Sequence, residues 1–148
     1  MADDKTAPET AGKTYLTQGA REPETQIGDA MAALAATIER RRSAGEQSYT
    51  YRLLTGDVDK LLKKVVEEAH ETTLAVKDAL RPDASGRDVD HVRYEAGDVI
   101  YHLLVLLARC GVSIDELAAE LNTRMTEDEI ERRGRVVMLK PEYVNRGR

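Results

Sequence analysis

The 148-residue sequence contains no phenylalanine and no tryptophan, and its only aromatic residues besides histidine are six tyrosines. A hydrophobic core must therefore be built from Leu, Val, Ile and Ala, and together with only four prolines this composition favours an all-helical fold. Cysteine is nearly absent as well. The single Cys110 excludes an intrachain disulfide and a cysteine-based zinc site, and it is typical of a protein from the reducing cytoplasm.

The sequence also lacks a surplus of basic residues and a long apolar run. A net charge of -5 argues against generic nucleic-acid binding, because proteins that bind the phosphate backbone are usually basic. The longest apolar run, residues 103–108, is too short to cross a bilayer, and residues 1–8 include acids and no apolar stretch. We therefore expect a soluble cytoplasmic protein with no secretory signal and no nucleic-acid or membrane partner.

The chain length fits one domain with tails. Residues 1–26 are polar and without periodicity, which predicts a flexible N-terminal extension. We assign residues 27–125 to one all-α domain and residues 126–148 to a C-terminal appendage. Helical periodicity and end signals predict four helices, and the segment between the first two is expected to be a polar loop over residues 45–51. The four helices are expected at residues 27–43, 57–80, 88–109 and 113–125.

Two acidic motifs lie on two of these predicted helices. Glu67, Glu68 and Glu71 form E-E-x-x-E, and Glu95 and Asp98 form E-x-x-D. Spacings of three and four residues place side chains on one side of a helix. Five carboxylates on two packed helices repel one another unless a cation lies between them, and oxygen ligands alone suit Mg²⁺ or Mn²⁺ rather than zinc. Because Mg²⁺ held by few carboxylates keeps positions for substrate phosphates, the motifs predict phosphate-ester or pyrophosphate chemistry.

The first motif, taken alone, also fits an ordinary solvated surface. The helix over residues 57–80 carries one apolar stripe, made of Leu61, Leu62, Val65, Ala69, Val76 and Leu80. Glu67 and Glu71 project roughly opposite this stripe, Glu68 lies at its edge, and the acids could form ion pairs such as Lys63–Glu67 and Lys64–Glu68. On this interpretation the acids need no metal.

The second motif favours the metal interpretation. The helix over residues 88–109 is apolar nearly all round, so it should be buried, and Glu95 and Asp98 lie where its buried stretch begins. Unpaired carboxylates are costly in such a place. A transition-metal stripe that adds His91 and His102 is an alternative, although His102 has apolar neighbours typical of a core histidine with one hydrogen bond.

Phosphate binding would fall to the metal and to basic side chains. The sequence has no Gly-rich phosphate loop, no G-x-G-x-x-G, no H-E-x-x-H and no C-x-x-C motif. The nearest basic residues in sequence are Lys60, Lys63, Lys64 and Arg52. Point charges beside a metal-bound polyphosphate would serve this role, and ordinary surface ion pairs are the alternative for each of them.

Several runs of residues resemble the phosphoribosyl-ATP pyrophosphatase family. S-Y-T at residues 48–50 and K-K-V-V-E-E-A-H-E at residues 63–71 resemble the N-terminal half of its domain, and E-A-G-D-V-I-Y-H-L-L-V-L-L at residues 95–107 resembles its second signature. The similarity covers roughly residues 28–125. The acidic pattern is shared with the wider MazG-like all-α nucleotide pyrophosphatases, whereas the S-Y-T and Y-H-L-L-V-L-L runs favour the histidine-pathway enzyme.

The resemblance implies the second step of histidine biosynthesis, the cleavage of phosphoribosyl-ATP to phosphoribosyl-AMP and pyrophosphate. It implies a four-to-five-helix MazG-like bundle, dependent on Mg²⁺ and completed by formation of a homodimer. Carried over by position, the metal ligands or water-activating groups would be Glu67, Glu68, Glu71, Glu95 and Asp98, with Glu67 and Glu68 as the catalytic candidates. The substrate-side residues would be Lys63 and Lys64 for phosphate, with Ser48 and Tyr49 nearby.

Two residues depart from the family pattern, and two rival functions remain. Val66 stands where the family usually has glycine, and His70 occupies a position that is more often small or acidic. Because Val66 could alter how closely the substrate approaches, a different nucleotide substrate is an alternative. The rivals are a house-cleaning NTP or dNTP pyrophosphatase and a non-catalytic helical dimerisation module with solvated acids.

Overall fold

The computed structural model describes residues 26–126 and 128–129 of the chain. This part contains five α-helices, one turn of 3-10 helix and no strand, which confirms the all-α class. The elements are α1 (Ile27–Arg40), η1 (Arg41–Ser43), α2 (Tyr49–Thr55), α3 (Val58–Ala79), α4 (Gly86–Arg109) and α5 (Ile114–Asn122). The predicted N-terminal extension and C-terminal appendage lie almost entirely outside the described residues, and the domain boundaries remain predictions.

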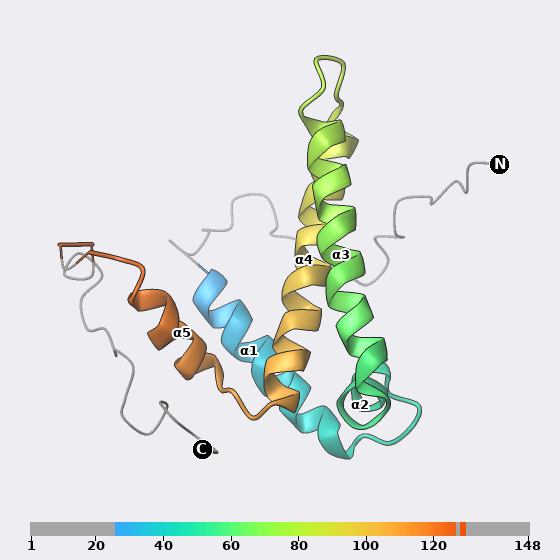
Figure 1. The fold of residues 1–148 in the computed structure, drawn as a ribbon, viewed down its shortest axis with the longest axis vertical. Helices are drawn as coiled ribbons and strands as arrows, with labels where there is room; N and C mark the ends of the chain where they lie inside the picture. The colour runs from blue at the N-terminus through green and yellow to red at the C-terminus, as the bar shows by residue number, and fades with distance from the viewer. Residues whose placement is uncertain (1–25, 127, 130–148) are drawn as a thin grey trace, which may run out of the picture.

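Helices α3 and α4 form a long antiparallel hairpin, and the shorter helices gather around its base (Figure 1). Helix α1 packs on α4, α2 contacts both α3 and α4, and α5 folds back toward α1. Among the described helices, none alone is both long and apolar enough to cross a membrane, and only the bent pair of α4 and α5 passes that test together.

Local sequence explains where the helices of the hairpin begin and end. Asp57 caps α3 by accepting a hydrogen bond from the Asp59 backbone N–H at 3.0 Å. The Asp88 carboxylate accepts from the Ser85 backbone N–H at 2.6 Å and so closes the first turn of α4. After α4 the chain turns through Gly111 with φ of 74°, a conformation that glycine adopts without strain.

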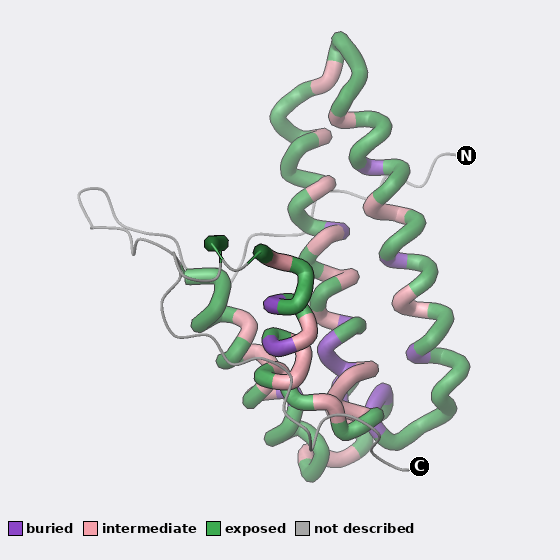
Figure 2. Tube along the Cα trace, turned by 60° about the vertical axis from the view of Figure 1, so that its left-hand side comes forward, coloured by how far each residue is buried: buried purple, intermediate pink, exposed green. Residues whose placement is uncertain are grey.

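The core lies at the base of the hairpin, where four helices meet. Its buried members come from α1, α2, the start of α3 and the end of α4: Ile38, Leu53, Leu54, Leu61, Leu104 and Val105. Figure 2 shows buried residues concentrated in this region, while the tip of the hairpin is exposed. As the composition predicts, this core is aliphatic.

Two expectations about the elements are wrong. The segment predicted as a loop over residues 45–51 contains the start of α2, because Ser48 caps a helix whose Leu53 and Leu54 are buried. Most of the apolar stripe of α3 does not face the interior of the chain: Leu62, Val76 and Leu80 are exposed, as is Ala69, whereas Leu61 at its start is buried. The buried residues of α3 are Leu61, Glu68 and Ala75, spaced by seven, so one of the predicted acids points inward.

Candidate metal and nucleotide site

Three carboxylates from the two helices of the hairpin converge between them. Glu68 and Glu71 lie on α3, one turn apart, and Glu95 lies opposite on α4. Each can place one oxygen atom within 4.8 Å of the other two. Glu68 and Glu95 are buried, at 6% and 4% exposed, and Glu71 is half-buried. We call these three residues the acidic cluster.

The two carboxylate oxygen atoms of Glu95 differ in their surroundings. Its Oε1 accepts a hydrogen bond from His91 Nε2 at 2.8 Å, whereas its Oε2 is buried without any hydrogen-bond partner in the described part of the chain. A buried carboxylate oxygen without a partner is costly. A cation coordinated by oxygen atoms would satisfy it, so the donor set fits Mg²⁺ or Mn²⁺.

The electrostatics of Glu68 indicate the same need for a cation. Burial raises the pKa of its carboxyl group above the ordinary value, and the negative charges of Asp98 and Glu71 raise it further. Lys64 partly opposes this effect, with Nζ 3.5 Å from Glu68 Oε1. A divalent cation between these acids would reverse the repulsion that now disfavours ionisation.

The other two predicted acids lie beside the acidic cluster rather than in it. Glu67 is exposed and forms an ion pair with Lys64 at 3.1 Å, an interaction that raises the pKa of the lysine. Asp98 is half-buried on α4, and its charge acts on Glu68. The structure therefore separates an inner group of three carboxylates from two that flank it.

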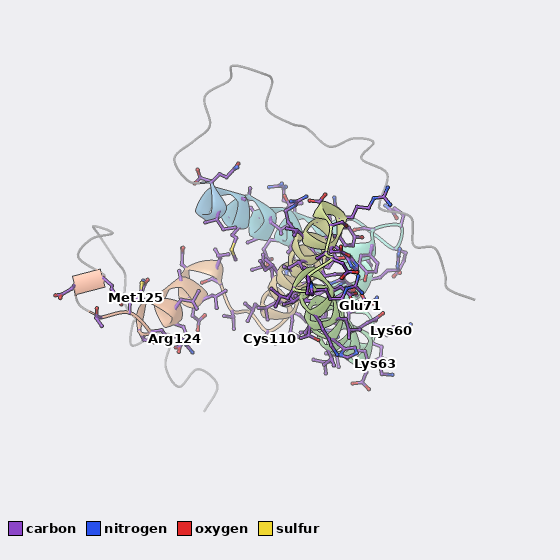
Figure 3. The ribbon with its side chains drawn as sticks, turned by 90° about the horizontal axis from the view of Figure 1, so that it is seen from above. Lys60, Lys63, Glu71, Cys110, Arg124 and Met125 are labelled. Carbon is purple, nitrogen blue, oxygen red and sulfur yellow. The ribbon has the colours of Figure 1, made fainter. Side chains whose placement is uncertain are left out.

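The predicted basic residues differ in their positions around α3. Lys64 lies beside the acidic cluster through its contacts with Glu67 and Glu68. Lys63 lies about 140° round the helix from Glu68, because the two are five positions apart and each position turns the helix by about 100°. In Figure 3, Lys60 and Lys63 extend from α3 toward the edge of the molecule. Of the three lysines, Lys64 is the one in contact with the acids.

Residues predicted to lie near the substrate come from the start of α2. Ser48 is its N-cap and accepts from the Tyr51 backbone N–H at 3.3 Å. Tyr49 is 42% exposed, with the guanidinium carbon of Arg52 5.9 Å from its ring centroid. An aromatic ring and a cation thus lie together on α2.

Two side-chain hydrogen bonds join α2 to α4 close to Asp98. The Tyr49 hydroxyl lies 3.1 Å from His102 Nε2, and Thr50 Oγ1 lies 2.7 Å from the Tyr101 hydroxyl. The expectation of a core histidine is confirmed, since His102 is 5% exposed, although it makes two hydrogen bonds rather than one. Sequence reasoning missed the roles of Thr50 and Tyr101. The sequence feature that could have indicated these roles is a pair of adjacent polar residues on each helix, Tyr49-Thr50 and Tyr101-His102, whose side chains meet across the two helices.

Most of the described part of the chain is similar in sequence to proteins of one family. Residues 31–125 match the Phosphoribosyl-ATP pyrophosphohydrolase family. A phosphoribosyl-ATP pyrophosphatase from Cupriavidus metallidurans is 40% identical over 100 residues, which cover 65% of this chain and 82% of the relative. The corresponding protein from Rhodopirellula baltica is 44% identical over 90 residues, covering 60% of this chain and 71% of that protein.

A bifunctional histidine-biosynthesis protein, HisIE from Halalkalibacterium halodurans, contains a similar segment. It is 41% identical over 95 residues, which cover 64% of this chain and 41% of that longer protein. The matched segment of this chain contains all five predicted acids, the Tyr49–His102 contact and Lys64. The chain therefore belongs to the phosphoribosyl-ATP pyrophosphohydrolase family.

Proposed function

We propose that this protein hydrolyses phosphoribosyl-ATP to phosphoribosyl-AMP and pyrophosphate, the second step of histidine biosynthesis, in the cytoplasm. The observation that carries the proposal is the acidic cluster with the unpaired Oε2 of Glu95, in a chain whose residues 31–125 match this family. Bringing three carboxylates together costs free energy unless a cation lies between them, and their oxygen atoms are suitable ligands for Mg²⁺.

The acidic cluster supplies the ligands for Mg²⁺, or for Mn²⁺ as an alternative, in this proposal. Glu68, Glu71 and Glu95 would hold the ion, and Asp98, whose charge acts on Glu68, would be a further ligand. A bound Mg²⁺ ion supplies charge withdrawal from the phosphorus and lowers the pKa of a water molecule.

The remaining residues bind and orient the reacting groups. Water attacks the α-phosphorus, a new P–O bond forms, and the bond to the bridging oxygen breaks to release pyrophosphate. Glu67 and Glu68 are the candidates to orient the water and accept its proton. Lys64, between these two acids, is placed to stabilise negative charge on the departing phosphates, with Lys60 and Lys63 further out on α3. Ser48, Tyr49 and Arg52 would form the nucleotide side of the site.

The departure at Val66 gives no support to a different nucleotide. Val66 is 70% exposed, and on α3 it lies about 160° round the helix from Glu68, away from the acidic cluster. A bulky residue there does not narrow the space in which a substrate phosphate would meet the acids. We therefore retain phosphoribosyl-ATP as the substrate.

Pyrophosphate release tests the proposal directly. Phosphoribosyl-ATP, ATP, dCTP and dUTP are each supplied with Mg²⁺ and, in parallel, with EDTA. We expect turnover of phosphoribosyl-ATP that EDTA abolishes, with the other three nucleotides cleaved far more slowly. Preferential cleavage of a plain nucleotide would keep the carboxylate chemistry and overturn the histidine assignment. Inactivity on all four would favour the dimerisation module.

We further propose that the working form is a homodimer. Large apolar side chains are exposed along both helices of the hairpin: Leu62 at 43%, Val66 at 70%, Leu80 at 79%, Val89 at 57% and Leu103 at 37%. Exposed apolar side chains on two neighbouring helices are typical of a surface that another protein chain covers. A second copy presenting the same two helices offers a matching apolar surface.

A further inference from the structure

Two adjacent hydrogen bonds fasten α2 to α4 just beyond the acidic cluster. Tyr49 meets His102 at 3.1 Å and Thr50 meets Tyr101 at 2.7 Å, so consecutive residues on one helix bond consecutive residues on the other. The two bonds differ in their surroundings. Thr50 is 2% exposed within the base of the molecule, whereas Tyr49 is 42% exposed at its surface.

The hydrogen-bond directions through His102 follow from its partners. Nδ1 lies 2.8 Å from the backbone carbonyl oxygen of Asp98, which can only accept, so Nδ1 carries the hydrogen and donates it. In the neutral ring Nε2 is then an acceptor, and the Tyr49 hydroxyl donates to it. One buried imidazole therefore connects the backbone of an acid beside the cluster to an exposed aromatic ring on α2.

Tyr49, which donates to His102, lies between the acidic cluster and solvent. Its hydroxyl points inward to His102, whose Nδ1 lies 2.8 Å from the backbone carbonyl oxygen of Asp98, and Asp98 follows Glu95 of the acidic cluster by one turn of α4. Much of its ring stays exposed, and Arg52 lies over the ring at 5.9 Å from the centroid. Tyr49 thus borders the acids on one side and solvent on the other.

We propose that His102 is a positioning residue, which holds the Tyr49 ring at a fixed place beside the acidic cluster so that the nucleoside part of the substrate contacts the ring while its phosphates reach the carboxylates. The inference rests on the proposed function and adds a residue that touches neither substrate nor metal. Fixing an aromatic ring in advance lowers the entropy lost when a substrate binds against it.

Steady-state kinetics with phosphoribosyl-ATP and Mg²⁺ test the role in Tyr49→Phe, His102→Asn and the double variant. Tyr49→Phe removes only the anchoring hydroxyl, while His102→Asn shortens the side chain away from Tyr49. Loss of one hydrogen bond corresponds to about a tenfold rise in KM, and we expect this in each single variant with kcat within about threefold of wild type. Because both changes break the same connection, the double variant should show no further rise.

Tyr101→Phe is the matched control, since it breaks the neighbouring bond between the same two helices. If Tyr49 and His102 merely fasten α2 to α4, all three single variants will lower the melting temperature alike and leave KM unchanged, which overturns the inference. A KM rise that multiplies in the double variant overturns it too, as does a loss confined to kcat. Should His102→Asn fail to fold, Tyr49→Phe at the surface still decides the matter by its KM. If wild-type protein releases no pyrophosphate, the proposed function itself fails, and this inference fails with it.

Discussion

Glu67 and Glu68 are neighbours in sequence with opposite surroundings, and this contrast predicts unequal roles. Glu68 is buried in the acidic cluster, whereas Glu67 is exposed and paired with Lys64. Glu68→Gln keeps the size of the side chain and removes its charge, so we expect pyrophosphate release to fall at least a hundredfold, on the order of 3 kcal/mol of lost transition-state stabilisation. Glu67→Gln should cost about tenfold or less. Equal losses in the two variants would show that burial does not distinguish their roles.

The raised pKa of Glu68 predicts how stability depends on pH. Its carboxyl group binds a proton more tightly in the folded protein than in the unfolded chain, where the ordinary value is 4.5. Ionised Glu68 therefore destabilises the metal-free fold, and this cost disappears as the pH falls from above the raised pKa toward 4.5. In EDTA at neutral pH, Glu68→Gln should melt at a higher temperature than wild type, and the difference should shrink on acidification.

Excess Mg²⁺ provides the control for this prediction, because a ligand of the folded state raises its melting temperature. Wild type should gain stability from Mg²⁺, and Glu68→Gln should gain little. Suppose that Glu68→Gln is less stable than wild type in EDTA and still gains full stability from Mg²⁺. That result would contradict both the destabilising effect of the ionised Glu68 carboxylate and its role as a metal ligand.

The sequence indicates which helices carry the acids, but not which of the five acids converge. Spacing places Glu68 and Glu71 on one side of α3, and the onset of a buried stretch marks Glu95, and these three do converge. The same spacing argument included Glu67, which is exposed beside the cluster, whereas Lys63 was chosen by its nearness in sequence. Periodicity assigns a residue to a side of a helix, but only the packing of α3 on α4 determines which side meets the second set of acids.

At the scale of elements, α2 depends on its cap more than on its length. With seven residues it is too short to be stable by propensity alone, and Ser48 satisfies one of its free backbone N–H groups. Ser48→Ala should lower the free energy of unfolding by about 1 kcal/mol in urea titrations. Ser48→Asn, an equally good cap, should keep wild-type stability. If both variants were equally stable but bound substrate poorly, Ser48 would act on the substrate instead of the helix.

The shortness of α2 also explains why the sequence did not predict it. Two turns give no usable period, and its two buried leucines are adjacent in sequence rather than spaced along a helix face. Tertiary contacts settle its conformation: Arg109 of α4 donates to the Leu53 carbonyl at 2.8 Å and to the Gly56 carbonyl at 2.7 Å, at the end of α2. The longer helices, which carry several periods and clear caps, were predicted to within about two residues at most of their ends.

At the scale of the whole molecule, most of the apolar stripe predicted on α3 is exposed, although Leu61 at its start is buried. A single chain places Glu68 and Ala75 against α4 and leaves Leu62, Val66 and Leu80 in solvent. The sequence pattern identifies an apolar face without saying whether the same chain or another covers it. The homodimer that we propose would resolve the discrepancy, because it would bury this stripe and leave the acidic cluster between α3 and α4 of each protomer.

Val66→Glu tests this arrangement with little risk to the fold of one chain, because the residue is 70% exposed there. A carboxylate buried in an apolar interface costs several kcal/mol, so we expect light scattering to give the dimer mass for wild type and the monomer mass for the variant. Asp78→Lys is the matched control: it also changes charge on exposed α3, but lies about 120° round the helix from Val66 and should remain dimeric. A monomeric wild type would refute the dimer outright. A dimeric Val66→Glu would place the interface on another face and leave the exposed stripe of α3 without an occupant.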